Sequence, residues 1–167
     1  MFERILLAID DTDAGRVASS YTVGLARHNA ADVRVIHVNQ LQVGGRGFTV
    51  ESESEAAKVV GDSVGQFLDA FVPATGAVAI ATCFDIADRI VAEAIDWNAD
   101  VILVGSRRKS KIRHLFGRPM HEKIASRTDL PILTAPAPFK GRWTRPLLEH
   151  LPGRKEQTIR ISGGKAA

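Results

Sequence analysis

Short apolar runs alternate along the chain with segments of helical periodicity. Runs with the length of buried strands occupy residues 4–9, 33–38, 78–83, 101–104 and 131–135. Between them, apolar positions recur every three or four residues and predict helices over 14–29, 53–71, 86–97 and from 119 onward. Strands that alternate with helices need crossover connections, which cover both faces of a parallel sheet. The pattern therefore predicts an α/β fold, a five-stranded parallel doubly wound sandwich.

Residues with known preferences for helix starts precede each predicted helix. They are Thr12 or Asp13 for the first, Ser52 with Glu55 as a capping box for the second, Asp85 for the third and Pro119 for the fourth. The apolar faces expected to be buried are Val17, Tyr21, Gly24 and Leu25 in the first helix, Val60, Val64, Phe67 and Phe71 in the second, and Ile86, Ile90, Ala94 and Trp97 in the third.

Two segments lack such periodicity. Residues 40–49 contain three glycines and are predicted to form a mobile loop. Beyond Pro136, prolines, glycines and scattered basic residues replace the pattern. We therefore expect an α/β domain at 1–136 and a basic C-terminal tail at 137–167 that is partly disordered.

Composition narrows the class of protein. The chain has 167 residues, 45% of them hydrophobic and 25% charged, as expected for a soluble globular domain. No apolar stretch approaches the ~20 residues that span a bilayer, and the N-terminal apolar run is too short for a signal peptide. Cys83 is the only cysteine, which excludes an intramolecular disulfide and fits a cytosolic setting. We expect it to pack as a small hydrophobic residue at a strand end.

Charge is unevenly distributed along the chain. The net charge is +3, but Asp and Glu outnumber Lys and Arg in residues 1–106, whereas Lys and Arg dominate residues 107–136 and 137–167. An acidic body with a basic loop and a basic tail indicates a localised anion site rather than a general nucleic-acid surface.

The strongest candidate for that site follows the fourth predicted strand. Gly105 and Ser106 end the strand, a basic run occupies 107–113, and Gly117, Arg118 and Pro119 lead into a helix. Glycine backbone amides, a helix start and fixed cations together suit a phosphate group. The alternative is that the glycines only shape turns and the arginines form a solvated surface. The spacing does not fit a Walker P-loop.

The first strand also ends in carboxylates. In a doubly wound sheet the ligand crevice lies beyond the carboxyl ends of the strands, so Asp10, Val38 and Gly105 should converge there. Asp11 and Asp13 are expected to cap the helix rather than bind Mg²⁺, because the chain lacks the further acidic residues of receiver domains and phosphatases. His37 is expected to be a packed residue, and the histidines show no metal-binding pattern. No motif indicates nucleophilic catalysis.

The order of these segments resembles the universal stress protein family over residues 2 to about 136. The resemblance is carried by residues 5–10, 35–38, 86–90, 99–106 and 129–133. It implies a Rossmann-like, adenine nucleotide α-hydrolase-like fold, a cytoplasmic location, and a homodimer whose fifth strands pair. It also implies that Asp10 contacts adenosine, Val38 presents backbone groups to adenine, Gly105 lies by the ribose, and Gly117 with its successor holds phosphates. The implied nucleotide-binding residues are Ile9, Asp10, Val38, Gly105, Arg107, Arg108, Gly117, Arg118 and Pro119.

The phosphate motif departs from the family pattern. Arg108 stands where the second glycine belongs, eight rather than nine residues precede Gly117, and Arg118 replaces a hydroxyl residue. An arginine side chain can block the close approach of a ligand to the backbone, but it can also bind a phosphate through paired hydrogen bonds.

The sequence is therefore compatible with two functions. One is a regulatory protein that binds ATP, AMP or another adenine nucleotide, with or without Mg²⁺ and with at most slow hydrolysis. The other is a nucleotide-independent dimer that docks a protein partner through the basic loop 107–118 or the tail 137–167. Nucleic acid is an unlikely partner, since Phe139 and Trp143 are the only aromatic residues of the tail.

Overall fold

The computed structural model describes residues 1–42, 48–106 and 118–136. The predicted tail and most of the basic loop lie outside these residues. In chain order the elements are β1 (Arg4–Ile9), α1 (Asp13–Asn29), β2 (Asp32–Gln42), β3 (Phe48–Thr49), α2 (Glu53–Asp69), β4 (Ala74–Thr82), α3 (Ile86–Asp96), β5 (Val101–Gly105), α4 (Met120–Ala125) and β6 (Ile132–Ala135).

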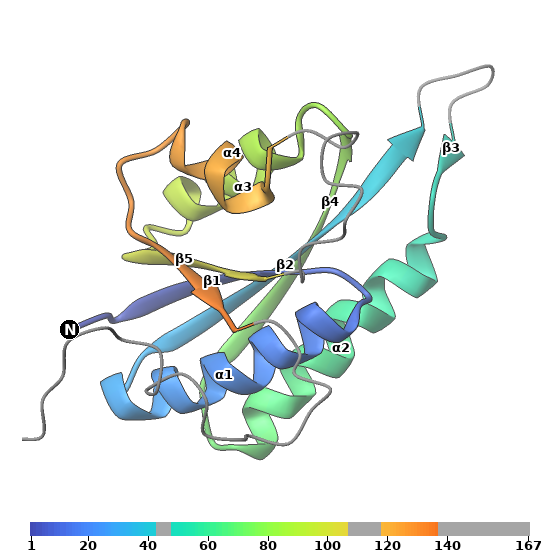
Figure 1. Cartoon of the computed structure of the whole chain (residues 1–167). Coiled ribbons are helices and arrows are strands. Elements are labelled where there is room, and N and C mark those ends of the chain that lie inside the picture. Colours follow the sequence, from blue (N-terminus) through green and yellow to red (C-terminus); the bar gives the residue numbers. More distant parts are fainter. Residues whose placement is uncertain (43–47, 107–117, 137–167) are drawn as a thin grey trace, which may run out of the picture.

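The predicted parallel sheet is confirmed. Five parallel strands lie in the order β4, β2, β1, β5, β6, with β1 at the centre. Helices α1 and α2 cover one face and α3 and α4 cover the other (Figure 1). The two-residue strand β3 pairs antiparallel with the end of β2 and was not predicted.

Each face of the sheet has its own apolar core. The larger residues of the α1 and α2 side include Ile5, Leu7, Val35, Phe67 and Leu103, all fully buried. The α3 and α4 side is built around Leu6, Ile36, Ile90, Ile102 and Ile124. Alternate residues of β1, β2 and β5 thus point to opposite faces, which is the arrangement that near-continuous apolar strands adopt when both faces are covered.

Some predicted strand boundaries were wrong. Strand β2 continues to Gln42, and β3 takes up Phe48–Thr49, so the predicted loop at 40–49 is partly strand. The strand predicted at 78–83 runs instead over Ala74–Thr82, because the small residues at its start pair with β2. Cys83 therefore lies just beyond the strand and is exposed, contrary to the expectation that it packs as a small hydrophobic residue at a strand end.

The helix starts follow the sequence signals closely. Thr12 is the N-cap of α1 and accepts a hydrogen bond from the Gly15 amide. Ser52 and Glu55 form the predicted capping box of α2. Asp85 occupies the N-cap position of α3, but its carboxylate accepts from the Thr82 hydroxyl instead of capping the helix. Pro119 is at the N-cap position of α4, just before its first turn.

The predicted buried faces are correct for α3 and wrong for most of α1. In α1, small residues face the sheet, among them Ala14, Ala18, Thr22 and Ala26, while Tyr21 is 50% exposed. In α2, Val60 and Phe67 are buried as predicted, but Phe71 lies past the helix end with a positive φ of 59° and is 95% exposed. Small residues let α1 lie close to the strands, and hydrophobicity alone does not reveal that.

Candidate functional site

Three predicted site residues lie level with one another at the carboxyl end of the sheet. Ile9 pairs with His37 of β2, and Ala8 pairs with Val104 of β5. Asp10 therefore follows the end of β1, and Val38 and Gly105 follow the last residues of β2 and β5 that pair with β1. The three residues lie across about 10 Å at the usual strand spacing of ~4.8 Å. The chain order reverses here, since β2 lies on one side of β1 and β5 on the other. This is the position where open α/β sheets bind ligands.

A cavity of about 450 Å³ opens beside Ile9 and Asp10. It lies between the end of β1, the first turns of α1 and the part of α2 from Glu55 to Gln66. Its lining consists of Ile9, Asp10, Asp11, Gly15, Arg16, Ser19, Val50, Glu51, Glu55, Lys58, Val59, Asp62, Ser63 and Gln66. Of the predicted site residues that the structure describes, Ile9 and Asp10 line it, and Val38, Gly105, Arg118 and Pro119 do not.

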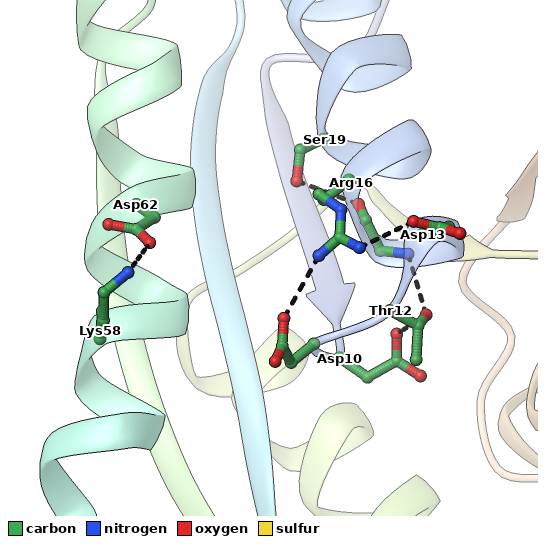
Figure 2. Close-up of polar contacts among 9 residues, drawn as sticks. Asp10, Thr12, Asp13, Arg16, Ser19, Lys58 and Asp62 are labelled. Atoms are coloured by element: carbon green, nitrogen blue, oxygen red, sulfur yellow. Dashed lines mark hydrogen bonds and ion pairs between the residues drawn. The ribbon is translucent and has the colours of Figure 1, made fainter.

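Asp10 is held tightly by the turn that starts α1. The Thr12 hydroxyl donates to Asp10 Oδ1 at 2.5 Å, and the Thr12 amide donates to the Asp10 carbonyl at 2.8 Å (Figure 2). A Cβ on Gly15 would lie 2.2 Å from that carbonyl oxygen, so only glycine lets the first turn pack this closely. Asp10 is therefore a preorganised carboxylate at the cavity wall.

The neighbouring acids have a different role from the predicted one. Arg16 lies 3.3 Å from Asp11 and 2.7 Å from Asp13, and the hydrogen bond with Asp13 raises the pKa of its guanidinium (Figure 2). The N-cap is Thr12, so the expectation that Asp11 and Asp13 cap the helix was wrong. Instead, they form ion pairs on the first turn of α1.

A polar network beyond the end of β1 was not predicted. His37 is buried, as expected, and its Nε2 lies 2.7 Å from a carboxylate oxygen of Glu51, while its Nδ1 lies 3.1 Å from the Ile9 carbonyl. The buried Asn39 side chain makes two hydrogen bonds with the Glu51 backbone, one as donor at 2.7 Å and one as acceptor at 3.2 Å. These contacts fix the segment that carries Val50 and Glu51 as a wall of the cavity.

The α2 side chains that line the cavity are mostly polar, and the charges of Lys58 and Asp62 cancel each other. Lys58 Nζ lies 2.6 Å from Asp62 Oδ2, and this contact raises the lysine pKa (Figure 2). Ser19 and Ser63 hydroxyls meet at 3.0 Å where α1 and α2 pack together. Both lining cations, Arg16 and Lys58, are ion-paired, and Asp10, Glu51 and Glu55 add negative charge. The cavity is therefore acidic.

Val38 can offer its backbone at this end of the sheet. The Asp32 amide donates to Glu3 next to β1, and the Val33 amide donates to Pro73 next to β4, so backbone groups of even-numbered β2 residues face β1. Val38 thus directs its backbone groups toward β1, where its amide faces the Ile9 carbonyl in the same register and its carbonyl lies beyond the last residue of β1. Its side chain packs against the core on the α3 and α4 face.

The structure gives Gly105 a packing role. A Cβ at this position would lie 2.8 Å from the Ala14 carbonyl oxygen, so glycine allows β5 to approach the start of α1. Arg118 is exposed, and Pro119 precedes α4, which is only six residues long. Arg107, Arg108 and Gly117 lie outside the described residues. The roles of these six residues in holding a ribose or phosphate stay predictions.

Sequence reasoning missed the residues that shape most of the cavity. Gly15 had a usable signal, because a glycine in the first turn of a helix implies close backbone approach. Glu51, Lys58 and Asp62 had none, since their contacts depend on how α2 lies beside α1. In the part of the chain that the structure describes, no group of three or more His, Cys, Asp or Glu side chains is placed to bind a metal ion.

The fold agrees with the comparisons to known proteins. The model of the universal stress protein family matches residues 1–136, and the chain belongs to this family. No curated protein matches the sequence significantly. Within the described residues, no helix is both long and apolar enough to cross a membrane.

Solved structures share the fold at low sequence identity. A universal stress protein family member from Burkholderia pseudomallei aligns with a TM-score of 0.63 and 19% identity, over 81% of this chain and 96% of that chain. The Archaeoglobus fulgidus universal stress protein in complex with dAMP aligns with a TM-score of 0.58 and 21% identity, over 79% and 96%. A universal stress protein in complex with cAMP aligns with a TM-score of 0.63 and 13% identity, over 80% and 95%.

Proposed function

We propose that this chain is a cytoplasmic regulatory protein that binds an adenine nucleotide at the carboxyl ends of β1, β2 and β5. The observation that carries the proposal is the cavity beside Ile9 and Asp10. It opens at the reversal of strand order, and similar proteins of the family are known in complex with dAMP and with cAMP. Its volume of about 450 Å³ falls within the usual range of small-molecule pockets, ~300–1,000 Å³.

The charges around the cavity orient the ligand. Carboxylates dominate its lining, and Arg16 and Lys58 are already neutralised by their partners. A phosphate placed in this cavity would meet an unfavourable potential, whereas the nucleoside would not. We therefore place the nucleoside in the cavity and expect the basic segment 107–118 to supply positive charge for the phosphates.

Three residues, Asp10, Val38 and Arg118, then bind different parts of the nucleotide. The Asp10 carboxylate accepts hydrogen bonds from ribose hydroxyls, because it is held at the cavity wall by Thr12 and Gly15. The Val38 backbone reads the base edge beyond the end of β1. Arg118, with the neighbouring arginines, supplies the positive charge for phosphates in place of the family's hydroxyl residue. We expect binding without rapid turnover, so that occupancy rather than product is the signal.

Calorimetric titration tests this proposal. The purified protein, freed of carried-over ligand, is titrated with ATP, AMP and cyclic AMP, with and without Mg²⁺. We expect micromolar binding of at least one nucleotide and at least ~tenfold weaker binding to Asp10→Ala, which corresponds to about 1.4 kcal/mol. Asp13→Ala is the matched control, because Asp13 is a carboxylate three residues after Asp10 that pairs with Arg16 but does not line the cavity.

The titration also separates the second function from the first. If no nucleotide binds, or if Asp10→Ala and Asp13→Ala weaken binding equally, the proposed site is wrong. The absence of binding would favour a nucleotide-independent protein that docks a partner through the basic loop 107–118 or the tail 137–167.

A further inference from the structure

Strand β4 is an edge of the sheet that lacks the usual protection against further pairing. Among the described residues it pairs with β2 alone, and Ala74–Thr82 contains no charged residue and no proline. Natural proteins place charged residues or proline on such an edge, or cover it with another segment, because its backbone groups pair readily with a further strand. Since β4 carries neither charge nor proline, we expect another segment to cover it.

The pairing with β2 shows which backbone groups of β4 point outward. The Val33 amide of β2 donates to the Pro73 carbonyl, so odd-numbered residues of β4 direct their backbone groups toward β2. Gly76, Val78 and Ile80 therefore present their amides and carbonyls along the open edge. Their side-chain positions lie on the α2 face of the sheet, because a Cβ at Gly76 would meet side chains of α2.

Apolar side chains are exposed beside this edge. Val78 is 43% exposed and Ile80 51%, although both point to the face of the sheet on which α2 packs. Phe84, just after β4, is exposed as well. Neighbouring apolar side chains with this much exposure indicate a surface that another segment covers.

Helix α2 extends this apolar surface. Val64 lies close to β4, because a Cβ at Gly76 would be 3.2 Å from its side chain. Ala57, Gly61 and Leu68 share its flank of the helix at spacings of three or four residues. The same flank begins with the exposed Glu53, so its one charge lies at the carboxyl end of the sheet. We call this flank, together with Val78 and Ile80, the apolar strip.

The C-terminal tail contains one segment with the pattern of a half-buried strand. Residues 158–162 read Thr, Ile, Arg, Ile, Ser, so that Ile159 and Ile161 alternate with polar residues. Threonine and isoleucine are β-branched and favour extended structure, in which both isoleucines lie on one face. A short strand of this kind is stable only when it joins an existing sheet. The open edge of β4 is such a sheet.

We propose that residues 158–162 of the same chain add to the sheet as a further strand, antiparallel to β4. Ile159 then lies opposite Ile80. Ile161 lies opposite Val78, so that both isoleucines cover the apolar strip. The two pairs exchange about four backbone hydrogen bonds at the outward-facing groups of β4. Backbone pairing combined with pockets for alternate side chains is the general way in which an extended segment binds to the edge of a sheet.

The length of chain after the described domain permits this docking. Strand β6 ends at Ala135 at the carboxyl edge of the sheet, four strand spacings or about 19 Å from β4. Residues 136–157 can extend to about 70 Å at ~3.3 Å per residue, so the chain reaches β4 with length to spare. A segment that arrives from the carboxyl edge runs toward the amino end of β4, which gives the antiparallel direction.

Charge and tethering both favour the chain's own tail as the occupant. Glu53 and Asp85 are exposed at the carboxyl end of the apolar strip, where the docked segment begins. Arg154 and Lys155 come shortly before that segment and carry the opposite charge. Complementary charges of this kind fix which segment binds and in which direction. A tethered segment also binds at a far higher effective concentration than a separate molecule does.

Amide hydrogen exchange of the full chain, followed by NMR, tests the proposal. We expect slow exchange at Val78 and Ile80, because the added strand accepts hydrogen bonds from their outward amides. Ile161→Asp should accelerate exchange at both amides at least ~tenfold, since a carboxylate cannot pack on the apolar strip. Leu148→Asp makes a comparable change elsewhere in the tail and should leave their exchange slow. Unchanged exchange at Leu7, in the core of the α1 and α2 face, shows that each variant is folded.

Cys83 allows a second measurement that locates the tail. It is the only cysteine of the chain, and it is exposed just past the end of β4. A nitroxide attached there should broaden the amide signals of residues 158–162 in the wild type, and Ile161→Asp should abolish this broadening. In a mixture of nitroxide-labelled chains with isotope-labelled chains that carry no nitroxide, we expect no broadening, because each tail docks on its own domain.

Three results would overturn the proposal. Rapid exchange at Val78 and Ile80 in the wild type would show that the edge of β4 is uncovered. Slow exchange that persists in Ile161→Asp would show that something other than residues 158–162 covers it. Broadening of residues 158–162 in the mixed sample would show that the added strand comes from a different molecule.

Discussion

Nε2 of His37 lies 2.7 Å from a carboxylate oxygen of Glu51, and this contact joins the end of β2 to the segment that leads into α2. The His37 side chain is only 4% exposed, whereas that of Glu51 is 29% exposed. The pair therefore closes one wall of the cavity from the inside. The Asn39 side chain reinforces it through two hydrogen bonds to the Glu51 backbone.

Removal of the Glu51 carboxylate should destabilise the fold. Glu51→Ala leaves a buried imidazole nitrogen of His37 without its partner, and an unsatisfied buried polar group costs about 1–3 kcal/mol. We expect a loss of that size in the free energy of unfolding, measured by urea denaturation at neutral pH. Asp62→Ala, which breaks the exposed ion pair with Lys58, should cost less than about 1 kcal/mol. Equal losses in the two variants would show that the contact between Glu51 and His37 contributes no more to the free energy of unfolding than an exposed ion pair does.

Glycine at position 15 should be irreplaceable, unlike glycine at position 24. Gly15→Ala forces a Cβ to within 2.2 Å of the Asp10 carbonyl oxygen, so the first turn of α1 must shift. Overpacking of this kind costs about 1–3 kcal/mol, and the shift should also weaken nucleotide binding because it displaces Asp10. Gly24→Ala enters open space and should stabilise the fold by about 0.5–1 kcal/mol. Thermal unfolding and calorimetric titration of both variants measure these effects, and a stable Gly15→Ala protein with unchanged affinity would contradict the packing described.

The capping box of α2 should make stability depend on pH in the acidic range. Hydrogen bonds from the Ser52 backbone amide and side chain lower the pKa of the Glu55 carboxyl below its ordinary value. A carboxyl with a lowered pKa in the folded state stabilises the fold above its unfolded pKa of ~4.3, and this stabilisation is lost as the pH falls through the folded-state pKa. The stability difference between the wild type and Glu55→Gln should therefore be present at neutral pH and shrink toward pH ~3. A difference that grows on acidification would show that Glu55 does not cap α2 as an anion.

Much of the fold could be predicted because it depends on local patterns. The apolar runs of β1 and β5 mark buried strands, and the Ser52 and Glu55 pair marks the start of α2, because each signal lies within a few residues of the feature it predicts. The buried face of α1 could not be predicted from hydrophobicity, since Ala18 and Thr22 face the sheet while Tyr21 faces solvent. Packing distance to the strands decides that face.

The site was predictable only where it coincides with strand ends. Asp10 follows β1, and Val38 lies in β2 just past the last residue that pairs with β1, so both lie at the edge where the carboxyl ends of parallel strands meet. The Glu51 wall depends on a contact with His37 fourteen positions earlier in the chain, and the Lys58 side depends on how two helices pack. Neither relationship leaves a pattern in the sequence.

An adenine nucleotide bound at the carboxyl ends of β1 and β2 should change the surroundings of the backbone amides there. The most direct measurement is an amide NMR titration of the ligand-free protein with AMP, with backbone assignments. We expect the chemical-shift changes to concentrate at Ile9 to Gly15, Val38 to Gln40 and Gly105. An absence of shifts with AMP, ATP and cyclic AMP, or shifts confined to α3 and α4 on the opposite side of the sheet, would contradict it.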